Sequence, residues 1–119
     1  MPRVTLSERA QNDLGRLYEF LAGVDEGVAD SAIEIIITSF ERLEQMPLIA
    51  PLVDGRNDIR KFIVPFGQSG YVAFYEYLHA TDTVVIATIM HQREKYFFES
   101  VSKNWKRKAP ERSEDQGGL

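Results

Sequence analysis

The N-terminal part of the chain repeats apolar residues at the spacing of an amphipathic helix. The first such stripe consists of Ala10, Leu14, Leu17 and Leu21. Charged residues separate its members and Ser7 stands ahead of them, so we predict a helix over residues 7–22 with the Ser7 hydroxyl as its N-cap. A short β-prone segment at residues 3–6 precedes this helix and is expected to form a strand.

A second stripe indicates another helix, which follows the break at residues 23–27 and ends at Met46, before Pro47. Its members are Ala29, Ile33, Ile36, Phe40 and Leu43. Because the connection is short, the two helices are expected to pack as an antiparallel hairpin. Further apolar residues lie beside this stripe, namely Val28, Ala32, Ile35 and Ile37. The apolar surface is therefore wide enough for two contacts, either with the first helix and a sheet or with a partner protein.

The pattern changes to strands after residues 47–58, which contain two prolines, a glycine and an asparagine and are expected to form a loop. Three β-rich segments follow, at residues 59–64, 70–78 and 83–91. Short turns join them, so they are predicted to form an antiparallel meander. The last segment is apolar at both odd and even positions, which indicates a central strand covered on both faces.

These elements predict one α+β domain, with an N-terminal strand, a helical hairpin and a three-stranded antiparallel meander packed on the helices. The chain has 119 residues, of which 44% are hydrophobic, and this is enough for a single core. We place the domain at residues 1–102, with a short helix expected from Tyr96 to Val101. Residues 103–119 are polar and are expected to form a flexible tail.

The composition excludes some kinds of chemistry for this chain. The chain has no cysteine, which excludes disulfides and cysteine-based metal or nucleophile chemistry and is compatible with a reducing compartment. It has neither a signal-peptide pattern nor an apolar stretch of about 20 residues. We therefore expect a cytoplasmic protein that makes no membrane contact and that uses no metal ion or cofactor.

The charge distribution is uneven. The net charge of −4 works against attraction of the whole molecule to nucleic acid, which favours clustered Lys and Arg. Residues 1–50 carry four Arg against nine acids, whereas residues 91–119 carry seven Lys or Arg against five acids. The acidic and the mildly basic ends are either ordinary solvated surface or faces for different partners.

Three stretches of the sequence resemble the ParE/RelE superfamily, the toxins of bacterial type II toxin–antitoxin modules. They are FERLEQMPLIAP, IRKFIVPFGQSGYVAFYEY and DTVVIATIMHQRE. The resemblance covers roughly residues 4–101. It implies a toxin that inhibits growth, that is neutralised by a cognate antitoxin, and that touches DNA only through that antitoxin.

The superfamily holds two kinds of toxin. RelE-like members are ribosome-dependent messenger RNA endonucleases, whereas ParE-like members inhibit DNA gyrase without cleavage. Cleavage through attack by a 2′-hydroxyl needs a base, an acid and cations that hold the developing charge. For a nuclease, the resemblance offers as candidates Arg60, Lys61, His91, Arg93 and Tyr96.

Two positions depart from the nuclease pattern. RelE-like nucleases are expected to carry an Arg directly after the Gly-Tyr pair, but Val72 stands there, and the position of their C-terminal Tyr holds Glu99. Neither side chain supports phosphate binding. We therefore favour a ParE-like gyrase inhibitor. The alternatives are a RelE-like messenger RNA endonuclease and a degenerate toxin-fold protein that only binds its antitoxin.

Two binding surfaces follow from this interpretation. We expect Arg60, His91 and Arg93 to lie together at one end of the sheet and to bind the target. The antitoxin is expected on the surplus apolar residues of the second helix, because partner segments bind along such apolar faces and open strand edges. These residues are Val28, Ala32, Ile35 and Ile37.

Overall fold

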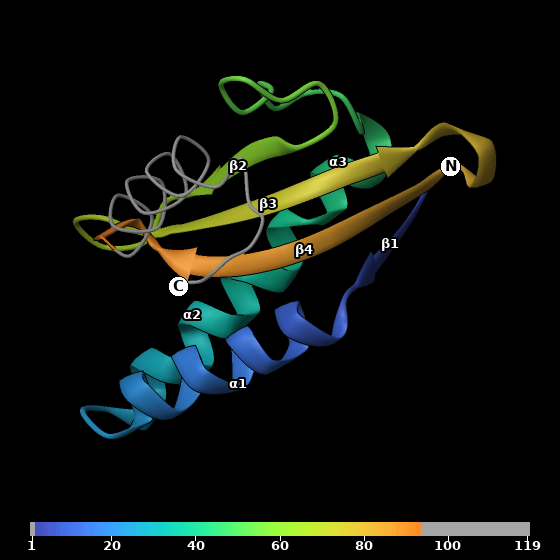
Figure 1. Cartoon of the computed structure of the whole chain (residues 1–119). Coiled ribbons are helices and arrows are strands. Elements are labelled where there is room, and N and C mark those ends of the chain that lie inside the picture. The colour runs from blue at the N-terminus through green and yellow to red at the C-terminus, as the bar shows by residue number, and fades with distance from the viewer. Residues whose placement is uncertain (1, 94–119) are drawn as a thin grey trace, which may run out of the picture.

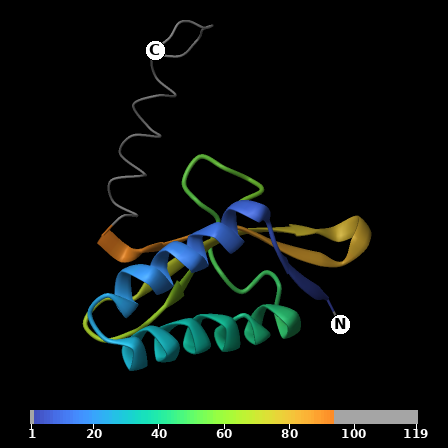
Figure 2. The same ribbon diagram turned by 90° about the horizontal axis from the view of Figure 1, so that it is seen from below.

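The computed structural model describes residues 2–93, which form a four-stranded sheet with two long helices on one face (Figures 1 and 2). The strands are β1 (Arg3–Leu6), β2 (Arg60–Val64), β3 (Tyr71–Leu78) and β4 (Thr83–His91). Their order in the sheet is β1-β4-β3-β2; β1 runs parallel to β4, and the other neighbours are antiparallel. The predicted α+β class, the meander and the central place of β4 are confirmed.

Helix α1 (Glu8–Ala22) begins where the sequence predicted. The Ser7 hydroxyl oxygen accepts a hydrogen bond from the Ala10 N–H at 3.0 Å, which is the expected N-cap. The same hydroxyl donates to the carbonyl oxygen of Ala87 in β4 at 2.8 Å. Ser7 therefore both starts the helix and attaches that start to the central strand.

The second predicted helix is divided in two, as α2 (Glu26–Ser39) and α3 (Glu41–Gln45). The Ser39 hydroxyl donates to the Ile36 carbonyl at 2.7 Å, and the Phe40 N–H bonds to Ile37 three residues back rather than four. Side-chain bonds of this kind compete with the helical ladder and bend a helix. The bend lets Phe40 pack against Phe62 of β2, with 6.4 Å between ring centroids.

Strand β4 contains a β-bulge that α1 holds in place. Phe74 of β3 lies opposite Thr88 and Tyr75 lies opposite Ile86, so Ala87 is the extra residue. On the far side of the bulge, the buried carboxylate of Asp13 accepts hydrogen bonds from the Thr88 hydroxyl at 2.6 Å and the Ile89 N–H at 3.0 Å. The helix thus holds the part of β4 that follows the bulge, which stays paired with β3 through His91.

The sheet is covered on both faces. The main core lies between the helices and the face that carries Tyr71, Ala73 and Tyr75. On the opposite face a smaller cluster is made by Val72, Phe74 and Met90, packed against Val53 and Ile59 of the loop before β2. The division of β3 into two apolar faces follows the alternation of its sequence.

Candidate functional site

His91, the last residue of β4, contacts Ser69, Arg93 and Tyr71 within residues 2–93. Its Nε2 lies 3.0 Å from the Ser69 hydroxyl oxygen, and its Nδ1 accepts a hydrogen bond from the backbone N–H of Arg93 at 3.1 Å. The ring also packs edge-on against Tyr71, with 5.5 Å between centroids and an interplanar angle of 86°. The imidazole is therefore fixed between the end of β4 and the β2–β3 turn.

That turn, residues 67–70, owes its shape to glycine. Gly70 has a φ of +117°, and a Cβ at this position would collide with the carbonyl oxygen of Val64. The Gly70 carbonyl accepts from the Gln92 N–H at 3.0 Å. The turn that carries Ser69 is thus tied to the residues that follow β4.

Arg60, the first residue of β2, holds the loop before that strand. Its Nη1 donates to the carbonyl oxygens of Ala50 at 2.7 Å and Leu48 at 3.2 Å. A guanidinium group that satisfies backbone carbonyls in this way has a clear structural role.

The expectation that Arg60, His91 and Arg93 lie together is wrong. Arg60 lies opposite Tyr75 of β3, whereas His91 lies opposite Tyr71. Strands β2 and β4 flank β3 and are both antiparallel to it, so they run in the same direction, and the start of β2 cannot lie beside the end of β4. The offset along β3 is four residues, or about 13 Å. Only His91 and Arg93 share an end.

The other positions weighed for nuclease activity also lie in different parts of the chain. Lys61 follows Arg60 on β2 and is half-buried. Val72 is fully buried in the smaller cluster, so its position on β3 offers nothing to a ligand. Tyr96 and Glu99 lie outside the described residues.

The residues expected to bind an antitoxin do not form one surface. Ala32 is completely buried, so it belongs to the core and not to an exposed edge. Val28 and Ile35 are seven residues apart on one flank of α2 and are 42% and 41% exposed. Ile37 is 44% exposed but lies on another flank, two turns from Asp30. The negative charge of Asp30 raises the pKa of Tyr18 in α1, so the Ile37 flank is the one on the side of the first helix.

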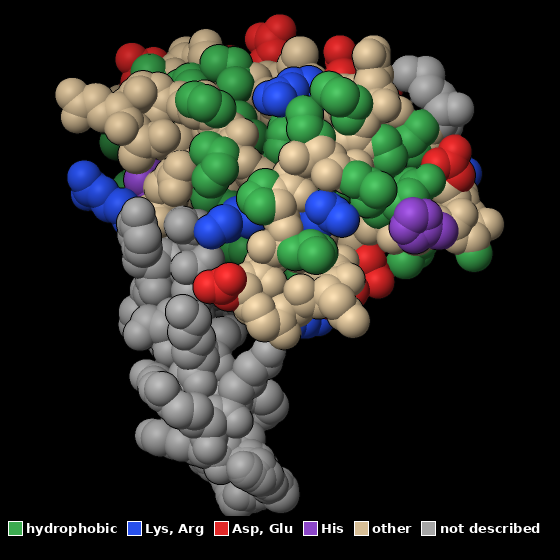
Figure 3. Space-filling model, turned by 90° about the horizontal axis from the view of Figure 1, so that it is seen from above, with side chains coloured by type: hydrophobic (Ala, Val, Ile, Leu, Met, Phe, Trp, Pro, Cys, Tyr) green, Lys and Arg blue, Asp and Glu red, His purple; other side chains and the backbone are tan. Residues whose placement is uncertain are grey.

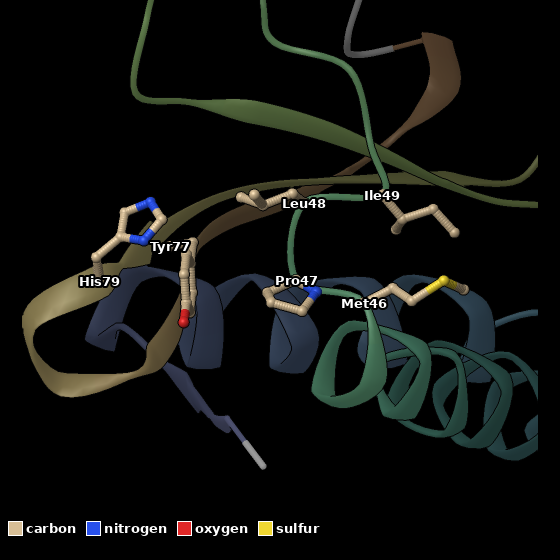
Figure 4. A pocket seen from close by; sticks show the side chains of 6 residues that line it. All are labelled: Met46, Pro47, Leu48, Ile49, Tyr77 and His79. Atoms are coloured by element: carbon tan, nitrogen blue, oxygen red, sulfur yellow. The ribbon is translucent and has the colours of Figure 1, made fainter.

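A groove that the sequence did not reveal lies between the loop after α3 and the end of β3 (Figure 4). It measures about 520 Å³ and is lined by Met46, Pro47, Leu48, Ile49, Tyr77 and His79. Tyr75 fixes this loop, because its hydroxyl donates to the Pro47 carbonyl at 2.7 Å and accepts from the Ala50 N–H at 3.4 Å. Burial raises the pKa of Tyr75. Hydrophobic side chains also gather, with Lys and Arg between them, on the face opposite the helices (Figure 3).

Tyr77 and His79 bring polar side-chain atoms to this groove, and the Tyr77 hydroxyl is already hydrogen-bonded. The Tyr77 hydroxyl donates to the Asp82 carboxylate at 2.6 Å, and this hydrogen bond raises the pKa of Tyr77. His79, in the 3₁₀ turn η1 (His79–Thr81), packs edge-on against the Tyr77 ring at 4.5 Å. The lining residues therefore offer mainly hydrophobic contact, with the exposed His79 imidazole as the polar exception. The only sequence signal was apolar residues in a segment expected to be loop.

Within residues 2–93, no three His, Cys, Asp or Glu side chains come together as a metal-binding group. Over the same residues, no helix combines the length and the hydrophobicity needed to cross a membrane.

Solved structures place the fold among bacterial toxins. The chain resembles a structure titled "Chromosomal ParDE TA system from P. aeruginosa", with a TM-score of 0.63 at 16% identity, over 76% of this chain and 96% of that one. It also resembles the intact E. coli RelBE toxin–antitoxin complex, with a TM-score of 0.54 at 18% identity, over 75% and 94% of the two chains. At these identities the similarity defines a RelE/ParE-like fold.

Sequence comparison defines the family. Residues 4–96 match the family described as the ParE toxin of the type II toxin–antitoxin system parDE. Toxin RelE3 of Caulobacter vibrioides is 36% identical over 98 residues, which cover 80% of this chain and 99% of that protein. The chain therefore belongs to the ParE toxin family of type II toxin–antitoxin systems.

Proposed function

We propose that this toxin stops growth by binding DNA gyrase, and that it does not cut RNA. The observation that carries this proposal is the separation of Arg60 from His91 and Arg93. A nuclease needs its base, acid and cations within reach of one phosphate. Arg60 is offset from His91 by about 13 Å along the sheet, and its guanidinium is bound to the carbonyls of Leu48 and Ala50, which keeps it away from a phosphate at His91. Binding to a protein surface makes no such demand.

Inducible expression in a bacterial host tests the proposal. A gyrase inhibitor should produce filamentation and DNA damage, and the purified toxin should block supercoiling by gyrase. His91→Gln should remain toxic, because binding needs no proton transfer. Arg93→Glu should lose toxicity, because reversal of an exposed charge at an interface introduces repulsion or an unpaired contact.

The runner-up is a RelE-like messenger RNA endonuclease. The relative named Toxin RelE3 and the shared location of His91 and Arg93 favour it. In that case induction should stop translation and produce cleaved messenger RNA, and His91→Gln should lower the cleavage rate by about 100-fold to 10,000-fold. That pair of results would overturn the gyrase proposal. A wild-type protein that leaves growth unaffected would instead be the degenerate, antitoxin-binding form.

We further propose that a cognate antitoxin neutralises the toxin by covering the α2 flank of Val28 and Ile35. The structural neighbours titled ParDE and RelBE are toxin–antitoxin systems, which supports a partner of this kind. Two large aliphatic side chains, each about two-fifths exposed, suit the apolar face of a partner helix or strand.

A further inference from the structure

The hydrogen bonds around His91 determine which ring nitrogen carries the proton. A backbone N–H can only donate, and that of Arg93 points at Nδ1, so Nδ1 must present a lone pair. A neutral imidazole then carries its proton on Nε2. Because Nε2 lies 3.0 Å from the Ser69 hydroxyl oxygen, the imidazole is the donor and Ser69 is the acceptor.

Because His91 donates this hydrogen bond, Ser69 keeps its own hydroxyl proton. A serine hydroxyl has one proton, and the oxygen that accepts from His91 remains able to donate it elsewhere. The bonds run in one sense, from the Arg93 N–H to Nδ1 and from Nε2–H to the serine oxygen. Such chains polarise one another and strengthen the final donor. His91 in this tautomer cannot take the Ser69 proton, so the pair is not a nucleophile and its base.

The hydroxyl is also held in position. The ring of His91 is packed against Tyr71, and the turn is shaped by Gly70 and tied to Gln92. Ser69 itself is exposed, as is Arg93. This end of the sheet thus presents a pre-positioned hydroxyl donor, and the exposed residue Arg93 binds the same imidazole through its backbone N–H.

We propose that Ser69 is a target-binding residue and that its hydroxyl donates to a carboxylate of the protein that the toxin inhibits. A donor hydroxyl at the end of the sheet that also carries Arg93 fits an anionic acceptor, since charge-assisted hydrogen bonds are the stronger ones. The acceptor belongs to a protein, because the chain carries a net charge of −4 and Arg60 lies four residues further along β3 than His91. RNA phosphates require clustered cations. The identity of the target, DNA gyrase, rests on the proposed function.

The tautomer is tested first, on the full chain and without any ligand. Long-range ¹H–¹⁵N correlation spectra at about pH 8 distinguish the two neutral forms of a histidine. We expect the Nε2–H pattern for His91. The Nδ1–H pattern would overturn the proposal, because Ser69 would then be the donor to His91.

Inhibition of gyrase supercoiling by the purified full-length toxin tests the hydroxyl. Ser69→Ala should weaken inhibition by about 10-fold to 100-fold, which is the range for a hydrogen bond to a charged group. Ser69→Thr keeps the hydroxyl and should stay within about 3-fold of wild type. Gln68→Ala, next to it in the same turn, is the matched control and should change little. Unfolding midpoints of all variants show whether the turn is intact.

The outcomes separate this proposal from the proposed function. If the wild type inhibits gyrase and Ser69→Ala matches Gln68→Ala, the Ser69 assignment is wrong and the gyrase function stands. If the wild type leaves gyrase active but cleaves messenger RNA, and Ser69→Ala reduces cleavage, the hydroxyl serves a phosphate. That result would overturn both the carboxylate assignment and the gyrase function.

Discussion

Among single residues, Asp13 is the buried polar group with the clearest role. Its carboxylate satisfies the Thr88 hydroxyl and the Ile89 N–H beside the β-bulge. Asp13→Ala should lower the free energy of unfolding by about 1–3 kcal/mol, because it leaves these donors unpaired away from water. Urea denaturation measures the change. Asn12→Ala, at the exposed neighbouring position, is the control, and equal effects of the two substitutions would contradict this role for Asp13.

Alanine substitutions at two glycines should change the stability of the fold in opposite directions. Gly15 lies inside α1, and a methyl group added there would meet no atom within 4 Å, whereas Gly70 has a φ of +117° and no room for a methyl group. Gly15→Ala should stabilise the fold by about 0.5–1 kcal/mol, the helix-propensity difference. Gly70→Ala should destabilise it by more than that, because the turn must shift. Thermal unfolding midpoints measure both, and a stabilised Gly70→Ala would show that the turn is not constrained.

At the scale of elements, α2 has two exposed flanks that the sequence alone could not tell apart. We expect Ile35→Asp to abolish binding of the antitoxin, because it puts a carboxylate in the apolar surface shared with Val28. Ile37→Asp, on the flank that faces α1, should keep binding. Both residues are close to two-fifths exposed, so the control is matched for burial. Co-purification of toxin with its cognate antitoxin measures binding.

Circular dichroism of the same variants shows whether α2 survives. Loss of helix in Ile35→Asp would mean that its effect on binding is structural. Equal loss of binding in Ile37→Asp, with helix retained, would place the antitoxin on the flank beside α1 instead.

Periodicity predicted most elements because the side chains themselves encode it. The first helix and all four strands were expected to within a residue of where they lie. The break at Phe40 was missed because it depends on the Ser39 hydroxyl and on a tertiary contact with Phe62. Both lie outside helical periodicity, which continues through Phe40.

The candidate site was harder to predict than the fold, because strand direction and not strand content decides which residues meet. Arg60 was wrongly expected beside His91 for this reason. Contacts between residues far apart in the sequence could not be predicted either. One example is that of Ser69 with His91, 22 positions apart. The sequence showed only that Ser69 is a hydroxyl residue in a turn with a glycine on each side. Its contact with His91 exists only once the hairpin has folded.

For the whole molecule, the buried Tyr75 predicts that the folded state loses stability at high pH. Burial raises the pKa of Tyr75 above its ordinary value of about 10, so the folded state holds this proton more tightly than the unfolded chain. The associated stability is fully present below pH 10 and is lost as the pH rises through the folded pKa. Urea unfolding between pH 9 and 11.5 should show a steeper fall for the wild type than for Tyr75→Phe. Equal slopes would contradict this linkage.

The extent of the folding unit gives the last prediction. The core clusters of the described chain draw on residues from Val4 to Met90, and the family match ends at residue 96. We therefore propose that a chain ending at Ser102 unfolds at the same urea midpoint as the full chain, because residues 103–119 are mostly polar. A chain ending at Asp82 lacks the central strand β4, and it should lose cooperative unfolding altogether. A clearly lower midpoint for the chain ending at Ser102 would show that the polar segment packs on the domain, and the boundary at residue 102 would be wrong.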